Sequence, residues 1–186
     1  MGGSILSIIR RLVFRLLGYH HYDYQEILEK YGFALSRPMT DLHRLSLMLP
    51  YLLIKSMRLT VASVMILDPE YGFYKVHAVD GDKCQIDGQL VRKESLLVQE
   101  LTARKKELFM PDVVDNNAIF QEMEKLSARL IIPAVSESFR FAKPTLLFSI
   151  NLGRILSGED FTDEDIAFLK KFVSQIMVNL EQAFVS

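Results

Sequence analysis

The sequence has one cysteine, Cys84, among its 186 residues. A single thiol cannot form a disulfide within the chain, and it excludes a zinc site built from several cysteines. Cysteine as scarce as this suits a reducing compartment. Net charge is also nearly absent, at −1 from 22 basic and 23 acidic residues. This balance argues against a general nucleic-acid binder, which carries a basic surface, so nucleic acid is not an expected partner.

Long apolar runs are missing as well, because none reaches the roughly 18 residues that a membrane-spanning helix requires. The sequence contains no internal repeat, low-complexity segment, glycine-rich nucleotide loop or phosphoacceptor-histidine motif. What remains is an ordinary globular composition, with 49% apolar and 24% charged residues. A chain of this length can bury a sizeable core as one domain with an extension.

The extension, residues 1–38, has an uneven charge distribution. Residues 5–17 place apolar side chains at helical spacing, with Arg10, Arg11 and Arg15 between them. This pattern predicts a short basic amphipathic helix. It fits two interpretations equally: a helix lying on an anionic membrane surface, or a helix packed on its own domain or on a second copy.

Two more helices are predicted before the first strand. Residues 22–37 form the first of them, which ends before Pro38 because the residue preceding a proline is disfavoured in a helix. The next helix begins at Thr40 or Asp41 as its cap, and Pro50 within it predicts a kink or a break. The sequence before residue 60 is therefore predicted to be helical.

From residue 60 the pattern changes to runs rich in β-branched and aromatic residues. Strands are predicted at 60–67 and 73–79, joined by a five-residue loop into a hairpin. The remaining predicted elements are a short strand at 88–93, a helix at 94–106, a strand at 107–113, a loop and short helix over 115–127, and strands at 128–135 and 144–153. This order predicts an α+β fold, with N- and C-terminal helices packed on one face of a mostly antiparallel sheet.

The last helix is predicted from its cap and from its apolar spacing. Thr162 and Asp165 stand at capping-box spacing, and acids fill the first turn, where the helix dipole favours them. A 3-4-3-4-3 spacing typical of a heptad seam then joins Ile166, Leu169, Val173, Ile176, Leu180 and Ala183. We predict that these six residues form a homodimer interface. The alternative is that they all face the chain's own core.

With these elements placed, the chain resembles a GAF domain, the small sensory fold common in bacterial signalling proteins. The resemblance is carried by residues 62–68 in the first strand, 130–135 in a late strand, and 151–165. The last segment contains the stretch G-x-x-[FY]-[ST]-x-x-[DE], through which a strand of such domains continues into the final helix. The likeness covers roughly residues 40–186, so we divide the chain into the extension and a GAF-like domain at 39–186.

The extension adds a second resemblance. Residues 11–15, followed by 22–28, are similar to the junction in some membrane-bound sensor kinases, where a basic segment leads into the GAF domain. This implies a cytoplasmic sensory module at the inner face of the membrane, from a two-component system, that dimerises through its terminal helices and relays a signal to an output domain. The alternative is a GAF domain that binds a small molecule and whose dimerisation is incidental.

Catalytic chemistry is not expected, because no set of reactive residues can be assembled. His20 and His21 are adjacent and point in different directions on a helix, so they do not pair as metal ligands. Cys84 lacks a neighbouring histidine of the kind that accompanies a chromophore-bearing cysteine in bilin-binding GAF domains. The chain is therefore predicted to be no enzyme and to use no metal or cofactor. The alternative is a residual enzyme that uses Cys84.

A ligand site is expected between the sheet and the middle segment, residues 94–143, since binding sites are apolar pockets with a few polar groups. His77 alternates with neighbouring strand residues and is a candidate to face the pocket. The other candidates are Phe109, Asp112, Phe120, Ile132 and Asn151. The alternative for each is an ordinary core residue.

Overall fold

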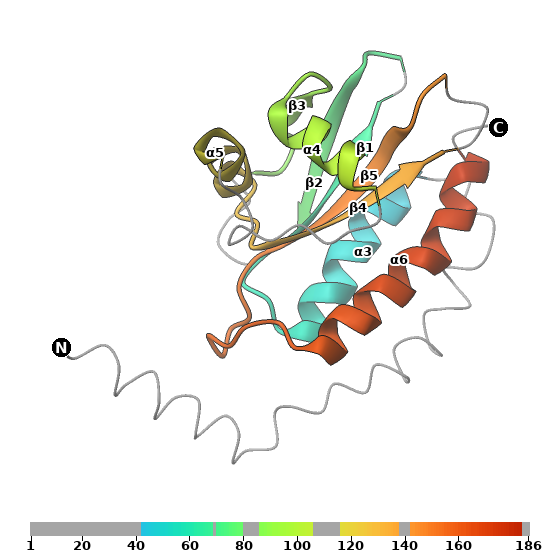
Figure 1. Ribbon diagram of the computed structural model, residues 1–186. Coiled ribbons are helices and arrows are strands. Elements are labelled where there is room, and N and C mark those ends of the chain that lie inside the picture. Colours follow the sequence, from blue (N-terminus) through green and yellow to red (C-terminus); the bar gives the residue numbers. More distant parts are fainter. Residues whose placement is uncertain (1–41, 69, 80–85, 106–115, 138–141, 184–186) are drawn as a thin grey trace.

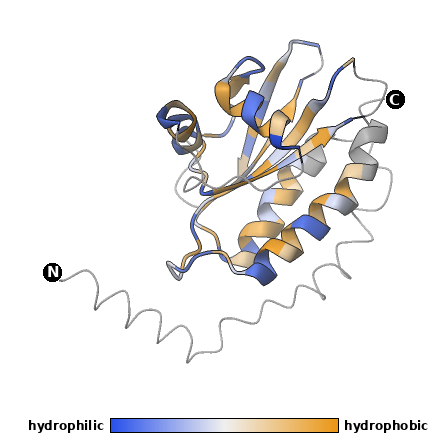
Figure 2. Ribbon diagram, in the orientation of Figure 1, coloured by the Kyte–Doolittle hydropathy of each residue, from blue (hydrophilic) through white to orange (hydrophobic). Residues whose placement is uncertain are grey.

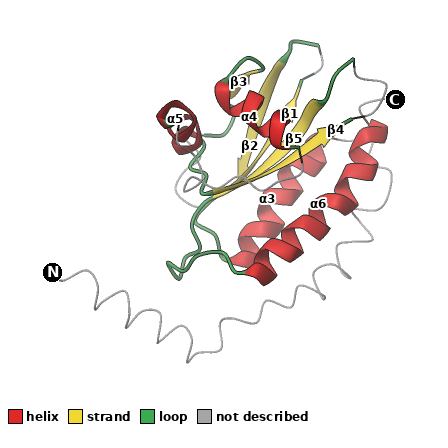
Figure 3. Cartoon of the chain, in the orientation of Figure 1, coloured by secondary structure: helices red, strands yellow, loops and turns green. Residues whose placement is uncertain are grey.

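The computed structural model describes residues 42–68, 70–79, 86–105, 116–137 and 142–183. Within these ranges an antiparallel sheet of five strands lies between two layers of helices (Figures 1 and 3). The elements in chain order are α3 (Leu42–Met57), β1 (Ala62–Leu67), β2 (Phe73–Val79), β3 (Leu90–Arg92), α4 (Leu96–Arg104), α5 (Asn117–Lys125), β4 (Leu130–Ser136), β5 (Thr145–Leu152) and α6 (Asp163–Ala183). The predicted α+β fold is confirmed. The helices predicted at 5–17 and 22–37 and the strand predicted at 107–113 lie outside the described residues.

The sheet has the strand order β3-β2-β1-β5-β4, and every neighbouring pair is antiparallel. The predicted hairpin is formed by β1 and β2, whose register pairs Leu67 with Tyr74 beside the turn. Asp68 closes that turn, since its carboxylate accepts hydrogen bonds from the backbone N–H groups of the two residues that follow Pro69. Strand β4 lies at an edge of the sheet, where Pro133 removes no needed ladder donor.

One face of the sheet is covered by α3 and α6 (Figure 1). Leu49, Leu53 and Met57 recur along α3 at helical spacing and are fully buried in the core cluster on this face. The helix runs through Pro50 without a break, although the proline removes one backbone donor. Burial of the apolar stripe on both sides of Pro50 holds the helix against the strands. Figure 2 shows the apolar residues concentrated along the sheet and on the helix surfaces that face it.

The start of α6 confirms the predicted capping box. The Thr162 hydroxyl accepts a hydrogen bond from the Asp165 backbone N–H at 3.2 Å, and the Asp165 carboxylate accepts one from the Thr162 N–H at 2.7 Å. Gly158, in the preceding turn, has φ of +79°, which a residue with a side chain adopts only with strain. This turn and cap set the point at which the chain leaves β5 and begins α6.

The opposite face of the sheet carries α4 and α5 (Figure 1). The Ser95 hydroxyl caps α4 by accepting from the Val98 N–H at 3.2 Å, and Asn116 caps α5 in the same way. A carboxylate oxygen of Glu122 on α5 also accepts a hydrogen bond from the Leu97 N–H at 3.0 Å. The first turn of α4 is therefore held both by its own cap and by the neighbouring helix.

Candidate functional site

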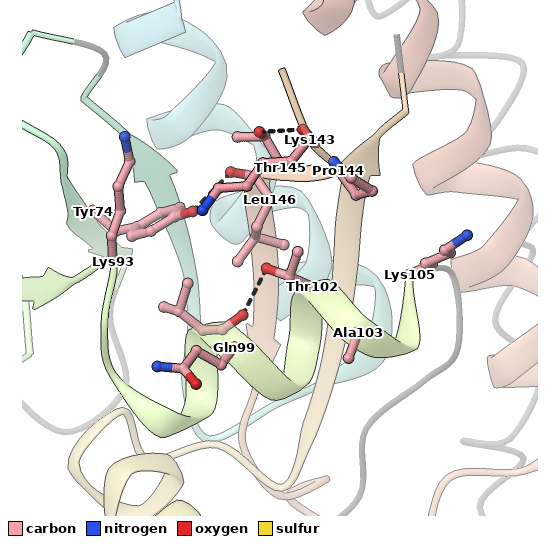
Figure 4. Close-up of a pocket in the computed structure, with 11 residues that line it drawn as sticks. Tyr74, Lys93, Gln99, Thr102, Ala103, Lys105, Lys143, Pro144, Thr145 and Leu146 are labelled. Atoms are coloured by element: carbon pink, nitrogen blue, oxygen red, sulfur yellow. Dashed lines mark hydrogen bonds between the residues drawn. The ribbon is translucent and has the colours of Figure 1, made fainter. Parts of the chain in front are cut away.

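A cavity of about 550 Å³ lies between α4 and the ends of β2 and β5 (Figure 4). Its volume is within the range of small-molecule sites. The residues that line it are Tyr74, Lys93, Val98, Gln99, Thr102, Ala103, Lys105, Lys143, Pro144, Thr145 and Leu146. The cavity lies between the sheet and the segment 94–143, which is the region where the sequence predicts a ligand.

Helix α4 forms one wall of the cavity and is firmly anchored. Leu97, Val98 and Leu101 are buried against the sheet, in the same core cluster as Tyr74 on β2. Thr102 lies on the cavity side, and its hydroxyl donates to the Val98 carbonyl at 2.7 Å (Figure 4). This wall of the cavity is therefore packed into the core of the domain.

Tyr74 contributes a buried hydroxyl group to the cavity lining. Its ring is 2% exposed, and its hydroxyl donates to the Leu146 carbonyl at 2.9 Å, reaching from β2 to the start of β5 (Figure 4). Burial raises the pKa of the Tyr74 phenol well above its usual range, because a phenolate there would lose its hydration. The side chain is therefore a neutral hydroxyl at physiological pH.

Replacing Tyr74 by phenylalanine is expected to lower the free energy of unfolding by about 1–2 kcal/mol near neutral pH, since one buried hydrogen bond is lost. The difference from wild type should shrink above about pH 10, where the unfolded wild-type tyrosine ionises and the folded one does not. Urea unfolding of both proteins between neutral pH and pH 11 measures this. A difference that stays constant or grows with pH would contradict the buried neutral phenol.

Among the described residues, the charged side chains that line the cavity are all lysines. Lys93 precedes α4, Lys105 follows its last turn, and Lys143 precedes β5, so the three lysines come from separate segments (Figure 4). None of the described residues that line the cavity is acidic. Lys105 is ion-paired with Glu137 just after β4. Among the described residues, no carboxylate forms an ion pair with Lys93 or Lys143.

A buried polar cluster lies on the same face of the sheet as the cavity. The Asn151 side-chain oxygen accepts from the Ser149 hydroxyl at 2.8 Å, and the Asn151 amide donates to the Ser63 hydroxyl at 3.1 Å. All three residues are at most 2% exposed. Asn151, a predicted ligand residue, therefore has its amide hydrogen-bonded within the sheet and is not a lining residue of the cavity.

The predicted ligand residues do not meet at one place. Ile132 is in the core beneath α3 and α6, and His77 pairs with Val64, which faces that same core. Asn151 is on the other face, and Phe120 is half-buried on α5. Phe109 and Asp112 lie outside the described residues. Since the sheet separates these positions, the described candidates cannot line a single cavity.

The predicted dimer seam is used inside the chain wherever its side chains are described. Leu169, Val173 and Ile176 are buried in the core cluster beneath the sheet, and Ile166 packs against that cluster. Heptad spacing appears on α6 because a helix lying along a sheet also buries one stripe. The side chains of Leu180 and Ala183 lie outside the described residues, as do Arg10, Arg11 and Arg15.

Sequence reasoning identified the region of the cavity but not its lysines. Lys93, Lys105 and Lys143 are isolated in the sequence, and only the turn of α4 back toward β5 brings them around one space. A usable signal was the position of all three at ends of predicted elements, where side chains meet at the rim of a sheet.

No described helix is long and apolar enough to cross a membrane, and no metal-binding cluster of histidine, cysteine or acidic residues occurs in the described part of the chain.

No protein-family model matches the chain, and no curated protein matches it in sequence. Solved structures do match its fold. The GAF domain of Acinetobacter phosphoenolpyruvate-protein phosphotransferase has a TM-score of 0.61 and 14% identity, over 87% of this chain and 94% of that one. The phycoerythrobilin-bound GAF domain of a cyanobacterial phytochrome has a TM-score of 0.59 and 9% identity, over 87% and 96%.

A third match is an enzyme. Free methionine-R-sulfoxide reductase from Neisseria meningitidis, solved with its substrate, has a TM-score of 0.58 and 11% identity, over 86% of this chain and 89% of that one. The chain has a GAF-like fold, as the sequence resemblance implies. The fold alone does not assign an activity, because function depends on the site that a fold carries.

Proposed function

We propose that the chain is a non-catalytic sensory module of the GAF type, in which a small molecule in the α4–β5 cavity alters the packing of α6. The observation that carries this proposal is that β5 contributes residues both to the cavity and to the core cluster that contains α6. Thr145 and Leu146 line the cavity, whereas Phe148, further along the strand, is buried in the cluster that contains Phe168 and Phe172 of α6. Packed cores transmit small displacements because their side chains have little free volume.

A change in α6 would be the output of the module. Such a relay requires two packings of similar free energy, one of which the ligand binds more tightly. We propose that α6 passes the change to an output domain, and that the module works as a homodimer in the cytoplasm, with Arg10, Arg11 and Arg15 near the inner face of the membrane. The exposed side chains of Leu47 and Tyr51 on α3 offer apolar contact area for such a dimer.

The cavity supports the ligand-binding part of this function more directly than the described seam supports the dimer. Leu169, Val173 and Ile176 are already buried within the chain and present no surface to a second copy. The proposed absence of catalysis rests on the described cavity lining, whose polar groups are lysines, hydroxyls and one amide, with no histidine, cysteine or carboxylate among these residues. Cys84 lies outside the described residues.

Filling the cavity should abolish the response to a ligand. Metabolites that raise the melting temperature of the wild-type protein by about 5 °C or more, as expected at ligand concentrations near a hundred times Kd, should lose this effect in Ala103→Trp. Ala103 is an exposed helix residue that lines the cavity, so the indole can enter it. A thermal-shift screen of a metabolite collection against both proteins measures the effect.

The matched control is Ala167→Trp, which places the same side chain at an exposed position on α6, on the opposite face of the sheet. It should respond to ligands as the wild type does. Two results would overturn the proposal: no compound stabilises the wild type, or the stabilising compounds act equally on Ala103→Trp.

A further inference from the structure

We propose that the α4–β5 cavity selects a small organic anion, with an apolar body held beneath α4 and an anionic group held between Lys93 and Lys143. This inference rests on the proposed ligand-binding function and names the chemical class of the ligand. It is carried by the charge of the cavity, the partners of its lysines and the chemistry of its floor.

The distribution of charge is the first observation. Three of the eleven described lining residues are lysines and none of the eleven is acidic, in a chain whose net charge is −1. Lysines gathered from three segments around one concave space produce a positive potential there. Such a potential raises the local concentration of anions and disfavours cations.

The ion-pair partners of the three lysines indicate which of them can contact an anionic ligand. The Lys105 ammonium is ion-paired with the Glu137 carboxylate, so its charge is already balanced. Lys93 and Lys143 have no ion-pair partner among the described residues, and both side chains are exposed at the rim. An anionic group at the rim can therefore be contacted by Lys93 and Lys143 without the rupture of an existing ion pair.

The floor of the cavity has a different character. Val98 and Leu146, which are buried, contribute apolar atoms to the floor, and the Tyr74 hydroxyl is engaged with the Leu146 carbonyl. A bare inorganic ion would gain nothing from such a floor and would leave most of the 550 Å³ filled only with water. The combination fits a molecule that has both an apolar body and an anionic group.

A pair of fluorescent probes separates the two features. Anilinonaphthalene sulfonate (ANS) has an aromatic body with one sulfonate, and N-phenylnaphthylamine has nearly the same body without the charge. The wild type should bind ANS more tightly than the neutral probe, and added salt should weaken ANS binding selectively. Fluorescence titration of the whole chain measures both dissociation constants.

The double variant Lys93→Gln/Lys143→Gln should weaken ANS binding by about five- to twentyfold, since exposed charge pairs contribute modestly and two are lost. Binding of the neutral probe should not change. Lys55→Gln/Lys170→Gln removes two exposed charges on the opposite helical layer and should match wild type.

Three outcomes distinguish the possibilities. ANS binding that survives the double variant, or a neutral probe that loses as much affinity as ANS, would overturn the anion inference. Binding of the neutral probe alone, abolished by Ala103→Trp, would keep the proposed ligand-binding function and refute the choice of an anion. Near-ultraviolet circular dichroism verifies that each variant retains the wild-type fold; if the double variant does not, the salt dependence of ANS binding to wild type decides the inference.

Discussion

Replacing Leu169 by alanine is expected to lower the free energy of unfolding by about 2–5 kcal/mol, because the side chain is fully buried between α6 and the sheet. Leu169 also belongs to the predicted dimer seam. Its substitution therefore distinguishes packing within the chain from contact between two chains. If it packs only within the chain, the stability lost in the variant relative to wild type should be the same at every protein concentration. Urea unfolding over a wide range of protein concentration measures both quantities.

Lys170→Ala is the matched control for Leu169→Ala. Lys170 is the next residue on α6 and is exposed, so its substitution should change the free energy of unfolding by less than about 0.5 kcal/mol. A Leu169→Ala protein that keeps wild-type stability but sediments as a smaller species would show that the seam joins two chains. It would contradict the buried placement of α6.

Replacing Asn151 by valine is expected to cost about 2–4 kcal/mol. The amide joins Ser63 and Ser149 in a fully buried network, and its removal leaves both hydroxyls without the partner they have in the sheet. An unsatisfied buried polar group costs more than the hydrogen bond itself contributed. Thermal and urea unfolding give the loss, and the loss should be present without any ligand.

A triple variant tests the cause of that loss. Ser63→Ala/Ser149→Ala/Asn151→Val removes all three polar groups together, so it should recover most of the stability lost in the single variant. The opposite result, a triple variant about as unstable as the sum of its single substitutions, would mean that the network does not act as a unit.

Much of the fold could be predicted because local chemistry decides it. The hairpin follows from the change to β-branched runs around a turn that Asp68 closes, and α6 follows from the Thr162–Asp165 capping box. At Pro50 the rule that a proline interrupts a helix was not sufficient. It predicts a kink or a break, but α3 continues because buried side chains on both sides hold it to the strands.

The site could be predicted less well, because it depends on which face of the sheet a residue reaches. Ile132 and Asn151 are both buried strand residues, yet one faces α6 and the other faces the cavity side. A shift of one residue in the pairing register would exchange these faces. The cavity lysines were missed for a related reason, since their proximity is produced only by the tertiary fold.

The most direct test of the central claim is an amide NMR titration of isotope-labelled protein with ANS. A ligand in the α4–β5 cavity should shift the amides of residues 98–103, Lys143, Thr145 and Leu146 most strongly, with smaller shifts along the sheet-facing side of α6 at 168–176. In Lys93→Gln/Lys143→Gln both sets of shifts should appear together only at about five- to twentyfold higher ANS concentration. Shifts centred on the outer surface of α3, or shifts in the cavity residues with none in α6, would contradict the account.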